Sequence, residues 1–322
     1  FYFKLKFFKM LNRRQLRIKA LEVVYAYDKS IEKNIDFQIK YFLKSNHNFF
    51  KLYITCFSLI KELYRKANEL NSKNKKKYLN NENDISLEKF CSNTILRRIF
   101  NDDYLSLKID DFKIDYWENH SELISSIWKE IVESDLTSKY LNNTNISFKN
   151  DKSYITNLYR KIIASNKKLY EFFEDNEISW INDLPLVNSL VLSSLKNNNK
   201  NSNKIVLMKD IYKNKEDADF GVSLIKKVID NKESLEKEIS NITLNWDNDR
   251  IAQIDLILLQ MCLSEFLYFK SIPVKVSINE YLEIAKEYSS KKSNVFINGI
   301  LDKLSKNLMK EGLLKKNKRG LQ

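Results

Sequence analysis

The sequence predicts an all-α protein, and three observations lead to this fold class. Only four glycines and two prolines occur among the 322 residues, too few for a protein built from many short strands and tight turns. Hydrophobic residues make up 43% of the chain and charged residues 30%, as in soluble globular proteins with a substantial core. Apolar residues recur at spacings of three and four along most of the chain, which indicates amphipathic helices.

The chain carries a formal net charge of +13. A surplus of this size favours polyanionic partners, either nucleic acid or an acidic membrane surface. A genome that enriches every protein in lysine and asparagine would produce the same surplus without any such partner. Composition alone leaves both explanations open, so the position of the charge along the chain has to decide.

Cysteine and histidine usage argues against a metal site and against catalysis. Cys56, Cys91 and Cys262 are isolated from one another, which predicts a reducing cytoplasm, with neither disulfides nor a zinc site. His47 and His120 are the only histidines and lie in unrelated surroundings. The sequence has no glycine-rich phosphate loop, no paired metal ligands and no nucleophile elbow. We therefore expect a protein that is not an enzyme, without catalytic residues, metal or cofactor.

The first domain that we expect is an arginine-rich helix within residues 1–30. Residues 1–19 contain seven basic residues and no acidic one. Their aromatic beginning is too short and too rich in lysine for a signal peptide. Met10 is the expected natural start, which would make residues 1–9 a dispensable, non-native extension.

Three arginines mark one side of this helix. Arg13, Arg14 and Arg17 fan over an arc of about 100°, and the same stripe continues with apolar residues as far as Tyr25. This pattern is typical of a helix whose later turns pack in a bundle while its first turns extend beyond it. Arginines held there at fixed spacing can meet phosphates or base edges. A frayed, solvated basic end would contain the same residues, and both interpretations stay open.

Residues 31–200 are predicted to form a helical insertion. Apolar residues at helical spacing indicate several helices, interrupted by a solvated break at 72–77. These helices are expected over residues 37–70, 86–100, 118–135 and 151–174. Residues 195–204 form a low-complexity polar run without apolar anchors, so we expect a linker there.

Residues 201–310 are predicted to form a helical core, followed by a basic tail over residues 311–322. Two shorter helices are expected first, over residues 219–231 and 233–242. Asn248 or Asp249 is then expected to cap a helix that continues to about residue 270. That helix is apolar on almost every side, which is typical of the central helix of a bundle.

Two further helices are expected after Pro273. Residues 277–280 have the pattern of a capping box, and Ser293 or Asn294 is expected to cap the last helix. Gly299 lies inside this last helix at a cost of about 1 kcal/mol against alanine. We therefore expect a close helix contact to require its small size.

Four stretches of this core form a recognisable combination, and the first helix adds a fifth. The four are Asp249-Arg-Ile-Ala-Gln-Ile-Asp255, Ile272-Pro-Val-Lys-Val-Ser-Ile-Asn-Glu280, Glu283-Ile-Ala-Lys286 and Phe296-Ile-Asn-Gly-Ile-Leu-Asp-Lys303. In the first helix, Arg13-Arg-Gln-Leu-Arg17 precedes Ala20-Leu-Glu-Val-Val-Tyr25. Together they resemble the NusB family of transcription antitermination factors, all-helical bacterial proteins that bind RNA. The chain is longer than the usual member and looks like the long, Bacteroidetes-type form.

The resemblance implies a fold of two packed helical sub-bundles and recognition of boxA, a short single-stranded element in the leader of ribosomal RNA transcripts. It implies NusE, a ribosomal small-subunit protein, as a partner, and assembly into an antitermination complex on RNA polymerase. No membrane partner is expected. The alternative function is a helical protein–protein adaptor that does not bind RNA directly.

Candidate RNA-binding residues lie in the first helix. Arg13, Arg14 and Arg17 would supply phosphate contacts and guanidinium stacking. Tyr25 matches an aromatic position of the family at which a base can stack. The alternative for Tyr25 is a tyrosine buried in the core.

A second group of candidates lies in the C-terminal core. Lys291, Lys292 and Ser293 precede a helix N-terminus, where backbone N–H groups and two ammonium groups suit a phosphate, although an ordinary solvated turn is the alternative. Phe296 would support a base or pack in the core. Asp255 matches an acidic family position near the RNA and partner surfaces, where it would accept hydrogen bonds from base edges. A plain interhelical salt bridge is the alternative for Asp255.

Overall fold

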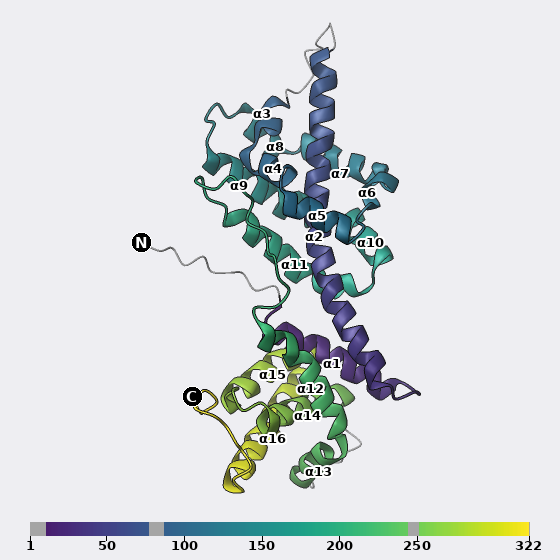
Figure 1. Ribbon diagram of the computed structural model, residues 1–322, viewed down its shortest axis with the longest axis vertical. Coiled ribbons are helices and arrows are strands. Elements are labelled where there is room, and N and C mark those ends of the chain that lie inside the picture. The colour runs from purple at the N-terminus through teal and green to yellow at the C-terminus, as the bar shows by residue number, and fades with distance from the viewer. Residues whose placement is uncertain (1–10, 77–86, 244–250, 322) are drawn as a thin grey trace. The chain divides into compact units, whose positions relative to one another are not determined.

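The computed structural model describes residues 11–76, 87–243 and 251–321 (Figure 1). These residues form helices joined by turns and loops, with no β-strand among them, which confirms the predicted all-α class. The described chain divides into two compact units. The inserted unit comprises residues 46–209, and the terminal unit combines residues 11–45 with residues 210–321. No helix within the described ranges is long and apolar enough to cross a membrane.

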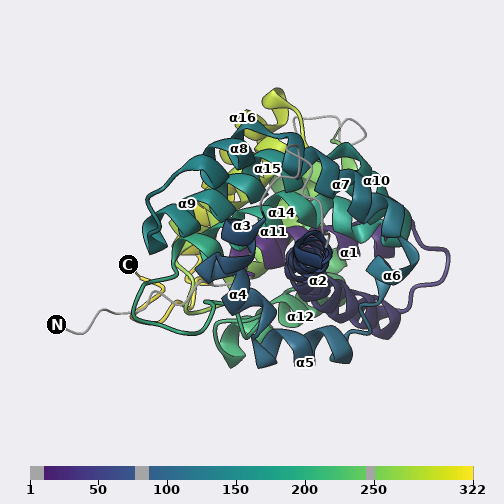
Figure 2. The ribbon, with the colours of Figure 1, turned by 90° about the horizontal axis from the view of Figure 1, so that it is seen from above.

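The inserted unit is built around α2 (Ile35–Lys76), whose first residues belong to the terminal unit. Figure 2 views α2 nearly end on, with α3, α4, α6 and α7 around it. The stretch from Leu52 to Ile60 is buried throughout, because other helices of the unit pack around this part of α2 on several sides. The predicted break at 72–77 is wrong for the described part of that stretch, since α2 remains helical to Lys76.

Shorter helices complete the inserted unit. They are α3 (Glu88–Ser92), α4 (Thr94–Phe100), α5 (Asp103–Asp111), α6 (Tyr116–Asn119), α7 (Ser121–Glu133), α8 (Asp135–Asn142), α9 (Phe148–Leu158), the π-helical turn η1 (Tyr159–Ile163), α10 (Lys167–Asn176) and α11 (Ser179–Lys196). The predicted helix over 86–100 is therefore two helices. Asn93 separates them, because its side chain accepts hydrogen bonds from the backbone N–H groups of Ile95 and Leu96 and so caps α4.

The polar run 195–204, predicted as a linker, is fastened to the inserted unit. The Nη1 group of Arg98 donates to the carbonyl of Asn199 at 2.9 Å. The ammonium of Lys152 donates to the carbonyls of Lys196 at 3.2 Å and Asn198 at 3.0 Å. Cations that satisfy carbonyls at the end of a helix stabilise it there. The linker prediction is therefore wrong for Lys196, Asn198 and Asn199, whose carbonyls accept these hydrogen bonds.

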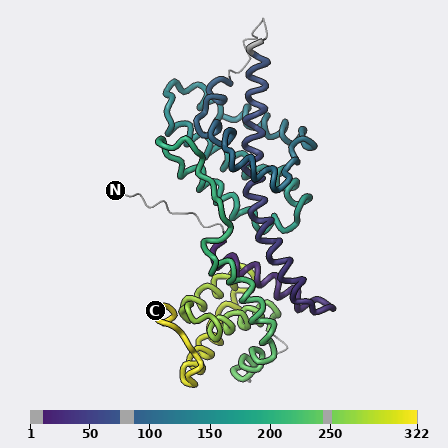
Figure 3. The backbone as a smooth tube through the Cα atoms, in the orientation of Figure 1, coloured from purple at the N-terminus to yellow at the C-terminus, as the bar shows by residue number. Residues whose placement is uncertain are grey.

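The terminal unit joins both ends of the chain. Its helices are α1 (Arg13–Lys29), α12 (Lys215–Asp230), α13 (Lys232–Ile242), α14 (Gln253–Tyr268), α15 (Val274–Tyr288) and α16 (Lys291–Lys310). Figure 3 shows α1, in purple, against the green and yellow helices of the C-terminal part of the chain. α1 packs on α12, α14 and α15, and α14 is buried along almost its whole length, as expected for a central helix.

Three of the predicted helix starts in this unit are wrong. The capping box predicted at 277–280 does not begin α15, which starts at Val274 directly after Pro273. Proline before the first helical turn removes an N–H that would have no partner there. The last helix, α16, begins at Lys291 and is capped by Ser290, not by Ser293 or Asn294. The expected caps Asn248 and Asp249 lie outside the described residues, and neither caps α14, which begins at Gln253 with Ala252 at its N-cap position.

The two glycines inside helices of this unit have opposite surroundings. A Cβ atom on Gly299 would meet no atom within 4 Å, so the expected close helix contact is absent. A Cβ atom on Gly221 would lie 2.2 Å from Cζ of Phe42. The close approach that the sequence placed at Gly299 occurs at Gly221 in α12, where the ring of Phe42 fills the space of a side chain.

Candidate nucleic-acid interface

The first turn of α1 is fixed by a capping box. The side chain of Asn12 accepts hydrogen bonds from the N–H groups of Arg14 at 2.8 Å and Gln15 at 3.2 Å. Gln15 accepts in return from the N–H of Asn12 at 3.2 Å. Such reciprocal caps satisfy N–H groups that have no partner inside the helix. They start the helix at Arg13 and hold the three arginines at defined positions, which excludes the frayed end.

Arg13 lies at the surface between two carboxylates of α12. Its Nη2 group contacts Glu216 at 2.7 Å, and its Nε group donates to Asp217 at 2.8 Å. Partial burial acts to lower the pKa of Arg13, but its hydrogen bonds to the two carboxylates and their charges together outweigh burial and raise the pKa. The side chain stays 21% exposed. Arg13 therefore forms an ion pair that solvent and an incoming anion can reach.

Arg14 forms a forked pair with Glu280 of α15. Its Nε and Nη2 groups each donate to one oxygen of this carboxylate, both at 2.9 Å. The hydrogen bond from Arg14 lowers the pKa of Glu280, so the pair stays charged at neutral pH. Arg14 is 37% exposed, more than Arg13 or Arg17.

Arg17 is buried in the core with only 2% of its side chain exposed. Its Nε and Nη2 groups donate to the two oxygens of Glu265 at 2.6 and 2.9 Å. The same carboxylate accepts hydrogen bonds from Ser277 and Tyr281, both at 2.8 Å. Burial acts to lower the pKa of Arg17, but the charge of Glu265 and the hydrogen bonds to it, with smaller contributions from neighbouring groups, together outweigh burial and raise the pKa. This burial argues against a direct RNA contact by Arg17.

The sequence offered one signal for this network. Glu265 interrupts an otherwise apolar helix, and a buried carboxylate requires a cationic or hydrogen-bonding partner. Sequence spacing could not identify that partner, because Arg17 and Glu265 are far apart in the chain and meet only when α1 packs on α14.

Tyr25 lies half-exposed near the end of α1. Its ring is 38% exposed, so Tyr25 is not the buried core tyrosine of the alternative interpretation. The ammonium of Lys29 lies 5.7 Å from the centre of the ring. An exposed ring is suited to stack a base, and the ammonium beside it is suited to contact the phosphate of that nucleotide.

Asp255 is 4% exposed at the start of α14. Its carboxylate accepts a hydrogen bond from the hydroxyl of Ser289, which follows the last residue of α15. Asp255 thus ties the beginning of α14 to the turn before α16. Its burial argues against a contact with base edges, and its described hydrogen bond is to a serine, not to a cation.

The first turn of α16 carries Lys291 and Lys292, both exposed, while Ser293 and Phe296 are half-buried. Ser290 caps the helix by accepting from the N–H of Ser293 at 3.1 Å. No acidic residue lies in this turn, although acids are the residues that a helix N-terminus favours. Two lysines beside the positive end of a helix raise the local potential and favour an anion.

The structure therefore arranges eight of the nine candidates in two groups, while Tyr25 lies near the end of α1. The three arginines lie in the first turns of α1, where Arg17 pairs with Glu265 of α14, whereas the turn before α16 lies beside Asp255. Ten residues of α14 separate these carboxylates, which corresponds to about 15 Å along a helix axis. Asp217, Glu216, Glu265 and Glu280, which hold the arginines, were not among the predicted site residues.

No group of three or more histidine, cysteine, aspartate or glutamate residues suited to a metal ion occurs in the described part of the chain. The candidate site consists instead of guanidinium and ammonium groups, carboxylates that pair with them, and an exposed aromatic ring.

Residues 186–306 match the family model described as NusB family. The chain is 39% identical over 118 residues to the Transcription antitermination protein NusB of Chloroherpeton thalassium, covering 37% of this chain and 56% of the relative. It is 41% identical over 88 residues to the protein of the same name from Clostridium botulinum strain Kyoto, covering 27% of this chain and 62% of that relative.

The chain thus spans 56% and 62% of the length of these two relatives. No solved structure matches it significantly. The matched residues include α12, α14 and α15, the three helices on which α1 packs. Residues 186–306 of this chain therefore carry a match to the NusB family.

Proposed function

We propose that this protein is an RNA-binding transcription antitermination factor. It acts on boxA-type sequences of ribosomal RNA transcripts, with NusE as its ribosomal-protein partner, within an antitermination complex on RNA polymerase in the cytoplasm. One observation carries the proposal. The arginine-rich helix α1 lies outside the matched residues 186–306, yet Arg14 and Arg17 pair with Glu280 and Glu265 inside them.

The energies of the ion pairs support separate roles for the three arginines. Exposed ion pairs contribute about 0–1 kcal/mol, so a phosphate can compete for the guanidinium groups of Arg13 and Arg14. Removing one partner of a buried pair costs about 3–5 kcal/mol, so Arg17 does not exchange Glu265 for a phosphate. Arg13 and Arg14 are the proposed contacts, and Arg17 is a positioning residue that fixes α1.

The other exposed candidates extend the proposed surface. Tyr25 offers its ring to a base, and stacking of this kind contributes about 1–3 kcal/mol per base. Lys291 and Lys292 offer charges to phosphates beside the N–H groups that begin α16. Asp255 would act indirectly, by holding the turn that carries the two lysines. These assignments are supported by exposure and charge.

Binding of a boxA RNA, followed by fluorescence anisotropy or mobility shift with and without NusE, tests the proposal. We expect wild-type protein to bind and the double variant Arg13→Ala/Arg14→Ala to bind more weakly. The slope of log K against log salt should flatten by about 1.4, because two phosphate contacts are lost and each contributes about 0.7 on a single strand. Arg160→Ala/Lys161→Ala, which removes two adjacent exposed cations of the inserted unit, is the charge-matched control.

Two results would contradict the proposal. If wild-type protein binds no RNA at low or moderate salt, with or without NusE, it does not recognise boxA. Binding of NusE in the absence of any RNA affinity would favour the adaptor function instead. If RNA binds but the slope is the same for wild type and the Arg13/Arg14 variant, the RNA lies elsewhere on the protein.

A further inference from the structure

The basic tail after α16 is turned back onto the terminal unit. Gly312 has a φ of 69°, a left-handed conformation that favours glycine. The N–H of Gly312 donates to the carbonyl of Met309 at 3.2 Å, and the N–H of Leu313 donates to that of Leu308 at 3.0 Å. These two bonds form a Schellman motif, which ends a helix and reverses the chain. In Figure 1 the yellow tail accordingly returns from the end of α16 towards α15.

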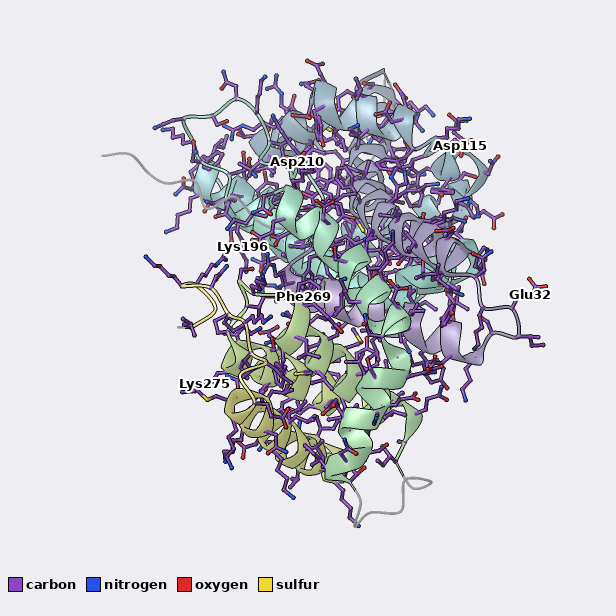
Figure 4. All side chains as sticks on the ribbon, turned by 60° about the horizontal axis from the view of Figure 1, so that its bottom comes forward. Glu32, Asp115, Lys196, Asp210, Phe269 and Lys275 are labelled. Carbon is purple, nitrogen blue, oxygen red and sulfur yellow. The ribbon has the colours of Figure 1, made fainter. Side chains whose placement is uncertain are left out.

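Three residues fasten the tail to the end of α14. The ammonium of Lys316 donates to the carbonyls of Glu265 at 2.9 Å and of Phe269, the residue labelled in Figure 4, at 3.0 Å. The N–H of Asn317 donates to the carbonyl of Lys270 at 3.1 Å. Gly320 lies so close to this carbonyl that a Cβ atom would be 2.1 Å from its oxygen. The tail therefore has one seated position, and Lys316 is an anchor.

The seated tail brings Arg319 beside Arg13. Its Nη1 group lies 3.8 Å from one oxygen of Glu216, while Nη2 of Arg13 lies 2.7 Å from the other. The side chain of Asn317 accepts hydrogen bonds from the N–H groups of Arg319 at 3.1 Å and Gly320 at 3.0 Å, which orders the backbone at this point. Two guanidinium groups from opposite ends of the chain thus share one carboxylate.

We propose that this tail is a second arm of the RNA-binding surface, in which Arg319, with Lys318, contacts the phosphates of nucleotides that flank the element read by α1. This inference rests on the proposed function and deepens it by naming a further contact. The ion pair of Arg319 with Glu216 is long, and its side chains are 67% and 51% exposed. Such a pair is weak, so a phosphate can replace the carboxylate between the two guanidinium groups.

The division of the tail's charges supports a polyanion as the occupant. Residues 312–321 contain four cations and no acidic residue. The ammonium of Lys316 is already bound to the carbonyls at the end of α14, and burial lowers its pKa. Lys315, Lys318 and Arg319 remain exposed. Because the backbone is already ordered, a phosphate contact here loses little conformational entropy.

Two RNAs separate this inference from the proposed function. One is the boxA core alone, and the other is the same core extended by unstructured nucleotides on both sides. We expect Lys318→Ala/Arg319→Ala to bind the core like wild type but the extended RNA roughly tenfold more weakly at about 0.1 M salt, with a salt slope flatter by about 1.4. Arg13→Ala/Arg14→Ala should weaken binding of both RNAs, and Arg160→Ala/Lys161→Ala should weaken neither.

A variant that keeps every charge tests the anchor. Gly320→Ala places a Cβ atom against the carbonyl of Lys270 and should release the tail. We expect it to lower affinity for the extended RNA, by less than the charge variant, while the thermal midpoint of the protein stays close to that of wild type. Alanine here changes neither the net charge nor the arginines of α1.

The binding results show whether the RNA arm formed by the tail fails alone or the proposed function fails as well. If wild type binds the core but Lys318→Ala/Arg319→Ala binds the extended RNA equally well, the tail is not an RNA arm and the proposed function stands. Equal affinity of wild type for the core and the extended RNA would also overturn the inference. If wild type binds neither RNA, the proposed function fails and the inference fails with it.

Discussion

Arg17 and Glu265 form a forked ion pair inside the terminal unit, with 2% and 0% of their side chains exposed. The pair joins the first helix of the chain to the central helix α14. Because Glu265 also accepts from Ser277 and Tyr281, its oxygens are satisfied without water. This network fixes the position of α1 and, through it, the positions of Arg13 and Arg14.

Arg17→Ala should therefore lower the free energy of unfolding of the terminal unit by about 3–5 kcal/mol, because it leaves the Glu265 carboxylate buried without its cation. Arg14→Ala, which removes a partly exposed pair, should lower it by less than about 1 kcal/mol. Urea denaturation followed by circular dichroism measures both. A double variant Arg17→Met/Glu265→Gln should be less destabilised than Arg17→Met alone, and simple additivity of the two changes would contradict a coupled pair.

Acid should weaken the pair between Arg14 and Glu280. The hydrogen bond from Arg14 lowers the pKa of Glu280, so this group contributes stability above the ordinary glutamate pKa of about 4.3 and loses it as pH falls through the lower, folded value. Glu280→Gln should flatten the loss of stability below about pH 4.3, measured by urea denaturation at several pH values. Glu311→Gln, at an exposed glutamate after α16, is the control, and an identical flattening there would contradict the assignment.

The lysines that begin α16 should affect stability and RNA binding in opposite directions. Lys291→Glu/Lys292→Glu places negative charge at the positive end of a helix and should raise the free energy of unfolding by about 0.3–1 kcal/mol per residue. The same variant should bind boxA RNA more weakly, because it repels phosphates. Calorimetry and anisotropy report the two effects. Unchanged RNA affinity in a stabilised variant would identify this turn as an ordinary solvated one.

The two helical glycines should respond differently to alanine. Gly299→Ala meets open space and should stabilise the protein by up to about 1 kcal/mol, since alanine favours helix. Gly221→Ala drives a Cβ atom into the ring of Phe42 and should destabilise it by about 1–3 kcal/mol. Thermal unfolding measures both changes. A destabilised Gly299→Ala variant would show a contact at that position after all.

The fold class and the positions of most helices follow from the amino-acid sequence alone. Scarce glycine and proline, and apolar residues at helical spacing, are local properties, so the all-α class and the buried nature of α14 follow from them directly. Helix starts do not follow in the same way, because several serines and asparagines near the end of one helix can each cap it. Ser290, not Ser293 or Asn294, caps α16, and a chain position alone does not rank these candidates.

Which of the candidate residues face solvent depends on how the helices pack, and the sequence does not show it. Arg13, Arg14 and Arg17 look alike in the sequence, yet one is buried on Glu265 while the other two pair at the surface. The tail gives a second example. Lys316 is an anchor and Arg319 is exposed only because the tail packs on α14, where Gly320 lies against the carbonyl of Lys270. Burial and ion pairing depend on residues that are distant in the chain, and helical periodicity describes only a helix's own surface, not the partner that covers it.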